Sequence, residues 1–173
     1  MKSVMFTLAL LLSLNAPLIA QLSPPKLKAV LLMKLSELEE HVSKDGKQVT
    51  IHVLSAPEVA AELRVFKGHK IGGAILTQVT ESDSLPTEQI DILFVGTNNS
   101  LKEVIKYARS NNVMTVTDRA DLFKKGLSVS IVMEGHKPKI SLNPGPSLKE
   151  GLKWNLNFEM FQSLTLEFKN NSQ

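Results

Sequence analysis

Apolar residues along this chain occur in short runs separated by polar turns, and the spacing within the runs changes from one segment to the next. Residues 112–143 show this most fully. The β-branched and apolar run at 113–116 predicts a buried strand, and residues 119–124 predict a helical turn. Residues 127–133 and 139–142 then predict two strands joined by a glycine-containing turn. This one segment therefore predicts a strand, a helix and an antiparallel hairpin.

The rest of the chain continues the alternation of strand-like and helix-like segments. Helices are predicted at 26–42, 55–66 and 101–109, and strands at 49–53, 72–79 and 90–95. The run Ile90–Val95 is interrupted only by Asp91, so we expect it at the centre of the sheet. This alternation predicts an α/β fold with a mainly parallel sheet, helices on both faces and the antiparallel hairpin at one edge.

A long C-terminal helix is expected after the Pro144-Gly145-Pro146 break, starting with the box Ser147 to Glu150. One apolar stripe of this helix would face the sheet and comprises Leu148, Leu152, Leu156, Met160, Leu164 and Phe168. A neighbouring aromatic stripe, at spacings of four and three, comprises Trp154, Phe158 and Phe161. Aromatic side chains often anchor interfaces, so we predict that this stripe contacts a partner or a second copy of the chain. The alternative is that it is core in a helix packed on two sides.

The first 20 residues have the layout of an export signal. Lys2 precedes the uncharged apolar run Val4–Leu14, and Pro17 and Ala20 follow it. We expect cleavage after Ala20, which leaves residues 21–173 as a single domain without stable membrane insertion. A retained membrane anchor is the alternative, although the run is short for a bilayer span.

Charge and cysteine content narrow the classes of partner. The formal net charge is +3, with both signs mixed along the chain, which argues against nucleic acid as a partner. The chain contains no Cys, so neither a disulfide nor thiol redox chemistry is available to it. Its stability must therefore come from packing alone.

The sequence shows no pattern that predicts catalysis or a cofactor. Its histidines are far apart, at His41, His52, His69 and His136. There is no Gly-x-Ser-x-Gly elbow, no glycine-rich phosphate loop and no Asp-rich calcium loop. We therefore expect no enzymatic activity, no bound metal and no cofactor. A hydrolase would require folding to bring a distant His and a carboxylate together.

Polar residues follow the predicted parallel strands, at the edge where open α/β sheets bind small molecules. The predicted ligand-binding residues are Thr97, Asn98, Ser100, Thr117 and Asp118. Helix N-termini at this edge would offer free N–H groups to a polar or anionic ligand, although Asp118 would repel an anion. The alternative is that Ser55, Ser100 and Asp118 cap the helices that follow them.

The order of elements and several motifs resemble the YfiR family of periplasmic proteins. The resemblance covers roughly residues 28–164 and rests on ILFVG, on the block VMTVTD..DLFKKG..VSIV.EG..PKISLN and on a Gly-Leu pair near the C-terminus. Its most specific part comprises Thr115, Val116, Thr117, Asp118, Phe123, Gly126 and Asn143. Family members often carry Cys, including one near the strand at 91–94, and this chain has none. Disulfide-based control of the family therefore cannot operate here.

The resemblance implies a non-enzymatic, periplasmic α/β domain that tends to form homodimers. The characterised branch of the family binds the periplasmic part of an inner-membrane diguanylate cyclase and holds it inactive, which lowers cyclic di-GMP signalling and biofilm formation. Related domains occur as sensory modules of membrane kinases. By resemblance, we expect a repressor of such a receptor, either a diguanylate cyclase or a sensor kinase. The alternative function is a periplasmic sensor of a small ligand with no fixed protein partner.

Overall fold

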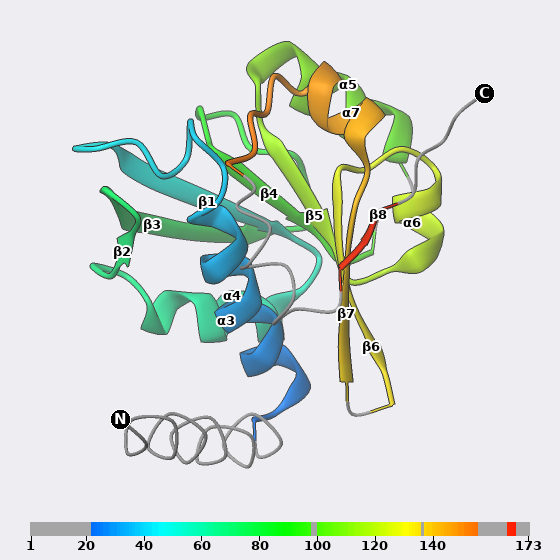
Figure 1. The fold of residues 1–173 in the computed structure, drawn as a ribbon, viewed down its shortest axis with the longest axis horizontal. Helices are drawn as coiled ribbons and strands as arrows, with labels where there is room; N and C mark the ends of the chain where they lie inside the picture. The colour runs from blue at the N-terminus through cyan, green and yellow to red at the C-terminus, as the bar shows by residue number, and fades with distance from the viewer. Residues whose placement is uncertain (1–21, 98–99, 136, 156–165, 169–173) are drawn as a thin grey trace, which may run out of the picture.

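The computed structural model describes residues 22–97, 100–135, 137–155 and 166–168. These residues form one mixed sheet of eight strands in the order β2-β3-β1-β4-β5-β6-β7-β8 (Figure 1). The strands are β1 Gln48–Leu54, β2 Lys70–Ile71, β3 Ala74–Ser82, β4 Ile92–Val95, β5 Met114–Thr117, β6 Val129–Glu134, β7 Lys137–Leu142 and β8 Leu166–Phe168. The helices are α3 Pro24–Ser36, α4 Pro57–Val65, α5 Leu101–Asn111, α6 Ala120–Lys124 and α7 Pro144–Lys149.

The strands at the centre of the sheet run parallel, as predicted. Strands β3, β1, β4, β5 and β6 are joined by parallel ladders. Strands β6 and β7 form the predicted antiparallel hairpin, and β8 pairs with β7 in parallel. A second antiparallel pair, β2 with β3, lies at the opposite edge and was not predicted.

Strand β4 lies at the centre and is buried on both sides, which confirms the prediction for this run. Ile92 and Phe94 belong to the larger core cluster, whereas Leu93 and Val95 belong to a second cluster on the other face. Successive side chains of a strand point to opposite faces, so a strand covered on both faces must be apolar throughout.

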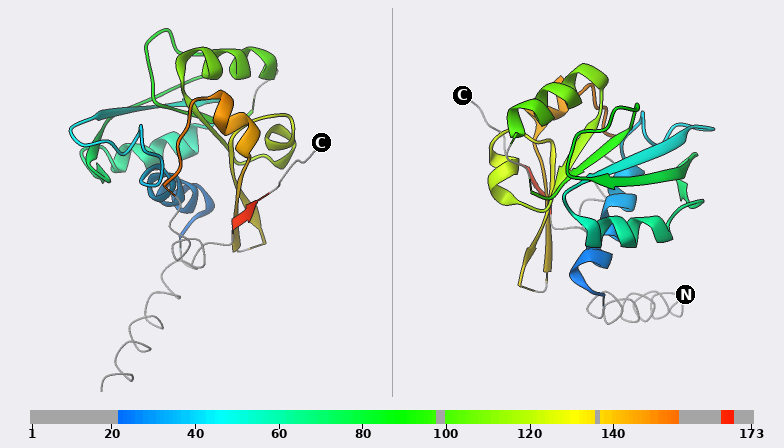
Figure 2. Two further views of the ribbon diagram at one scale, coloured as in Figure 1. Left: turned by 45° about the horizontal axis from the view of Figure 1, so that its top comes forward. Right: turned by 180° about the vertical axis from the view of Figure 1, so that it is seen from behind.

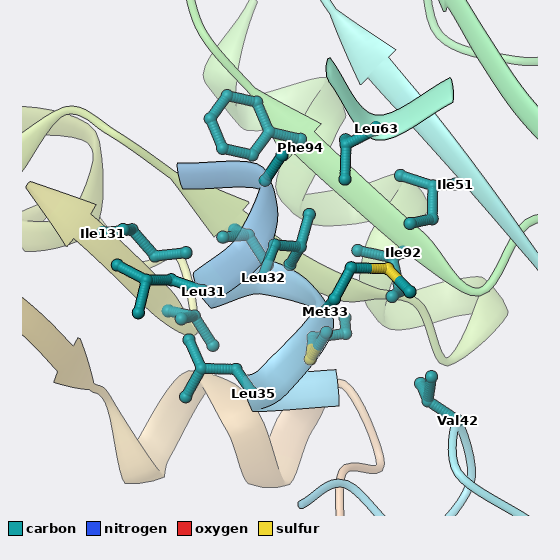
Figure 3. Close-up of a cluster of buried hydrophobic side chains, with 14 of the residues drawn as sticks. Leu31, Leu32, Met33, Leu35, Val42, Ile51, Leu63, Ile92, Phe94 and Ile131 are labelled. Atoms are coloured by element: carbon teal, nitrogen blue, oxygen red, sulfur yellow. The ribbon is translucent and has the colours of Figure 1, made fainter. Parts of the chain in front are cut away.

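Helices α3 and α4 cover the face that carries the larger cluster. Their fully buried side chains include Leu32 and Leu35 on α3 and Leu63 on α4. Figure 3 shows the α3 side chains gathered with those of β1, β4 and β6. Apolar contacts with the sheet and with α4 therefore hold α3 in place.

Helices α5 and α6 cover the other face. Val104 and Ala108 on α5 and Leu122 on α6 pack in the second cluster with Leu93 and Val95. Figure 2 shows α7 beside α5 on this side, and it shows that the sheet curls into a half-barrel. The expectation of helices on both faces is confirmed, around a sheet that is strongly curled.

The prediction of a long C-terminal helix is wrong for the residues that the structure describes. Helix α7 ends at Lys149, because Gly151 adopts a left-handed backbone with φ +73°. Ser147 lies inside this short helix and does not start a longer one. Leu148 is 78% exposed, so it does not face the sheet as the predicted stripe requires. The chain continues as a strap, defined here as residues 151–155, and the structure resumes at β8.

Candidate functional site

The carboxyl ends of β1, β4 and β5 meet at a crevice beside the start of α4. From β1 the chain moves to β3 on one side of the sheet, whereas from β4 it moves to β5 on the other. Open α/β sheets bind ligands at such a topological switch point. The switch-point crevice has a volume of about 370 Å³, and its walls include Lys28, Ser55, Ala56, Glu58, Thr97 and Asp118.

The structure brings only part of the predicted ligand-binding set to this crevice. Thr97 and Asp118 lie on its wall. Ser100 is exposed at the start of α5 and is not part of the wall. Asn98 lies outside the described residues.

Thr117, the fifth predicted ligand residue, is fully buried and has a structural role. Its hydroxyl donates to the Val95 carbonyl oxygen at 2.7 Å and accepts the Arg119 N–H at 3.1 Å. Both bonds tie the end of β5 to its neighbours. The Thr117 hydroxyl is therefore already hydrogen-bonded within the protein and is not available to bind a ligand.

Asp118 makes an ion pair that could not be predicted from the local sequence. The Lys28 Nζ lies 2.6 Å from Asp118 Oδ2, and the two side chains are 17% and 21% exposed. The pair joins α3 to the end of β5 across 90 positions of sequence. Because Lys28 offsets the charge of Asp118, an anion would meet less repulsion in the crevice than Asp118 alone would cause.

The prediction that Ser55, Ser100 and Asp118 cap helices through their side chains is wrong. Ala56, not Ser55, is the N-cap of α4, and the Ser55 hydroxyl donates to Asp83 Oδ1 at 2.8 Å. Ser100 is the N-cap of α5 but makes no side-chain cap hydrogen bond. Arg119 is the N-cap of α6, and Asp118 pairs with Lys28.

Arg119, also on the crevice wall, is engaged with Asp121. Its Nε donates to Asp121 Oδ1 at 3.0 Å, and its Nη2 donates to Oδ2 at 3.2 Å. This bidentate bond lowers the pKa of Asp121 and raises the pKa of Arg119. The guanidinium would have to leave Asp121 to bind a ligand in the same way.

Gly96 allows the ends of β1 and β4 to approach closely beneath the crevice. A Cβ at this position would lie 2.6 Å from the Ser55 carbonyl oxygen and 2.7 Å from the Ala56 Cβ. Contacts that short exclude any side chain. The glycine therefore fixes the floor of the crevice.

His52 is buried in a hydrogen-bond network that does not suit catalysis. Its Nε2 lies 3.1 Å from the Ser84 carbonyl oxygen, which can only accept, so Nε2 carries the proton. Its Nδ1 then accepts from the Thr80 hydroxyl at 2.7 Å. A protonated Nε2 cannot act as a base toward the Ser82 hydroxyl 3.3 Å away. Burial lowers the pKa of His52, which favours its neutral form.

Neither a metal-binding group nor a membrane span is found in the part of the chain that the structure describes. No three His, Asp or Glu side chains there come together in a group that could hold a metal ion. In the same residues, no helix combines the length and the apolarity that crossing a bilayer requires.

Trp154 is the one predicted partner-contact residue within the described residues, since Phe158 and Phe161 lie outside them. It is half-buried on the strap, packs against the larger core cluster and forms an isolated antiparallel bridge with Glu39. Its Nε1 is buried and has no hydrogen-bond partner among the residues that the structure describes. Trp154 is not on a long helix, so the helical-stripe argument does not apply to it. Partner contact through Trp154, Phe158 and Phe161 stays a prediction.

Glu150, which the sequence pattern assigned to a capping box with Ser147, is instead a fully buried carboxylate at the end of α7. It accepts hydrogen bonds from the Thr115 N–H at 3.0 Å, the Thr115 hydroxyl at 2.7 Å and the Ser128 hydroxyl at 2.5 Å. Burial raises the pKa of Glu150. Acidic residues near the ends of helices are usually exposed, so the sequence alone does not indicate that this carboxylate is buried.

A sheet covered by helices on both faces, with a crevice at its switch point, defines a domain of the open α/β class. The chain belongs to the YfiR/HmsC-like family, whose model matches residues 25–157. This places it among regulatory proteins. No curated protein matches the chain.

Proposed function

We propose that this protein is an exported, periplasmic regulator that binds an inner-membrane receptor of the diguanylate cyclase type and represses it. The observation that carries the proposal is the YfiR/HmsC-like match, which runs from α3 through the strap. The export signal at residues 1–20 is part of the proposal, and residues 21–173 form the regulatory domain. Repression would lower cyclic di-GMP signalling.

The mechanism we propose is a population shift in the receptor. A regulator that binds the inactive form of the receptor more tightly than the active form moves the equilibrium toward the inactive form. A tenfold preference supplies about 1.4 kcal/mol for this shift. The regulator needs no chemistry of its own, which agrees with the hydrogen-bonded, non-basic state of His52.

A crosslinked pull-down of the tagged protein from the periplasm of its own host tests the proposal. We expect mass spectrometry to identify a membrane protein with a diguanylate cyclase domain or, in the related arrangement, a sensor kinase. Recovery of the protein alone would count against a receptor partner. Light scattering on the purified protein tests the homodimer that we also propose.

Residue contacts are tested with the captured receptor's periplasmic part. We propose that Trp154, Phe158 and Phe161 contribute to the interface, so Trp154→Ala should weaken binding by roughly tenfold or more. Val65→Ala is the matched control, because Val65 is apolar and 69% exposed on α4. Circular dichroism must show a folded Trp154→Ala variant. An unfolded variant would identify Trp154 as core and contradict its proposed role.

A second candidate, a sensor of a small ligand, is favoured by the switch-point crevice. Its volume of about 370 Å³ and its position at the ends of β1, β4 and β5 suit a small polar molecule. A thermal-shift screen would detect such a ligand, because binding to the folded state raises the melting temperature. A true crevice ligand should lose its shift in Asp118→Asn. A shift that persists would place the ligand elsewhere.

A further inference from the structure

The strap is held at its far end by the turn that follows α3. Glu39 is fully buried, and its Oε1 accepts the Lys153 N–H at 2.8 Å. The Glu40 N–H donates to the Lys153 carbonyl oxygen at 2.8 Å, and the Asn155 N–H donates to the Leu38 carbonyl oxygen at 2.8 Å. These bonds fasten the strap to the face of the sheet that α3 covers.

The near end of the strap is held by Glu150 on the opposite face. Its carboxylate is 0% exposed and is bound by Thr115 of β5 and by Ser128, just before β6. The Thr115 hydroxyl also accepts the Ser128 N–H at 2.9 Å, so the two residues form one cradle. Among the described residues, the charged group that acts on the carboxylate is Arg109 of α5, and the Arg109 Nε is buried there without a hydrogen-bond partner.

Glu150 lies immediately before the strap, so docking of Glu150 together with the strap requires a carboxyl group to leave water. Burial raises the pKa of Glu150, and the bonds from Ser128 and Thr115 and the charge of Arg109 offset part of this effect. In a released strap, the same group would titrate near 4.5, as exposed glutamates do. The docked strap thus holds the proton more tightly than the released strap. By linkage, acid favours docking, and raising the pH through the docked-state pKa favours release.

We propose that the strap is a proton-controlled latch, which Glu150 closes when it is protonated and loosens when it is ionised. The cradle of Thr115 and Ser128 holds the carboxyl group, and Glu39, whose Oε1 also lies 3.3 Å from His41 Nδ1, holds the other end of the strap. The latch does not depend on which partner or ligand the protein binds.

Release of the strap would uncover apolar surface. Leu152 is 8% exposed and belongs to the larger core cluster, and Trp154 packs against the same cluster. Loosening residues 151–155 would expose both side chains together with the core residues beneath them. A change in proton concentration would in this way change the apolar surface that the protein presents.

Amide hydrogen exchange by NMR, measured from about pH 4 to pH 8, tests the latch. The reporters are the hydrogen-bonded N–H groups of Leu152, Lys153 and Asn155. After correction for the intrinsic exchange rate, we expect their protection to fall by up to about tenfold per pH unit as the pH rises from 4.5 to a midpoint, the docked-state pKa of Glu150, and to level off above it, because one proton is coupled. That midpoint should lie above 4.5. The Gly96 N–H, bonded to the Leu54 carbonyl oxygen in the core, should not show this fall with rising pH.

Two variants and a control separate the latch from general effects of pH. Glu150→Gln carries no charge at any pH, so its strap protection should not depend on pH. Arg109→Gln removes the charge that favours ionised Glu150 and should move the midpoint upward. Glu103→Gln replaces an exposed acid on α5 and should behave as the wild type.

Several results would overturn the latch. Protection of the strap that is independent of pH in the wild type would do so, as would an equal slope in Glu150→Gln. If Glu150→Gln does not fold, the pH midpoint of strap protection in Arg109→Gln tests the latch by itself. A midpoint that stays in place or moves downward in that variant would reject Glu150 as the titrating group.

Discussion

Gly96 sets the distance between β1 and β4 at the floor of the switch-point crevice. In Gly96→Ala, the new methyl group would lie 2.6 Å from the Ser55 carbonyl oxygen, so the two strand ends must separate. We expect a loss of roughly 1–3 kcal/mol in the free energy of unfolding, measured by urea titration. Gly145→Ala is the control, because its Cβ would meet nothing within 4 Å. Equal effects of the two substitutions would contradict the close approach.

His52 gives the protein an acid sensitivity of opposite sign to that of Glu150. Burial lowers its pKa below the 6.5 of an exposed histidine, so the unfolded chain binds a proton that the folded chain rejects. The free energy of unfolding should therefore fall as the pH drops through 6.5 toward the folded-state pKa. His52→Gln, which can still donate to Ser84, should show a smaller dependence on pH over this window. The exposed His69→Gln should leave the dependence unchanged, and a flat wild-type profile would refute the effect.

Helix α3 is an element whose stability comes from burial on the sheet. Leu32 is fully buried there, so Leu32→Ala should cost about 2–5 kcal/mol through lost contacts and a cavity. Chemical denaturation gives the value directly. Lys34→Ala on the same helix removes only an exposed ion pair with Glu37, and we expect a change within about 0.5 kcal/mol. A small effect at Leu32 would mean that α3 is not part of the stabilising core.

Elements fixed by local pattern could be predicted from the sequence, whereas elements fixed by distant contacts could not. Strand β4 and the β6–β7 hairpin follow from apolar runs and a glycine turn. The prediction of a long C-terminal helix was wrong because apolar residues four positions apart also occur where the chain leaves the helix at Gly151 and continues as the strap. The Ser-x-x-Glu pattern likewise does not show whether its Glu caps the helix. In this protein the Glu150 side chain instead enters the cradle formed by Thr115 and Ser128.

At the scale of the whole molecule, the strap ties the two faces of the sheet into one unit. Its attachments reach Glu39 on one face and the Thr115 cradle on the other. We therefore expect a single unfolding transition below pH 4.5, where the latch is closed. Far-ultraviolet circular dichroism and the fluorescence of Trp154, the only Trp in the chain, should give the same urea midpoint. Separate midpoints would show that the strap does not unite the faces.

The location of the crevice could be predicted, because strand ends in an α/β sheet gather at one edge. The side-chain interactions that line the crevice could not be predicted. Lys28 reaches Asp118 only through the packing of α3, and Thr117 turns its hydroxyl into the protein. Both outcomes depend on which side chains face each other after folding, and nothing in the local sequence around them records that.

Glu150 comes late in the chain, and its position limits the order in which parts of the fold can form. Thr115 and Ser128 come earlier, and their polar groups stay without their buried acceptor until residue 150 is available. An unpaired polar cradle between β5 and β6 opposes closure of the sheet. Under the proposed export, a chain that crosses the membrane N-terminus first would therefore complete this part of the sheet only after residue 150 had crossed.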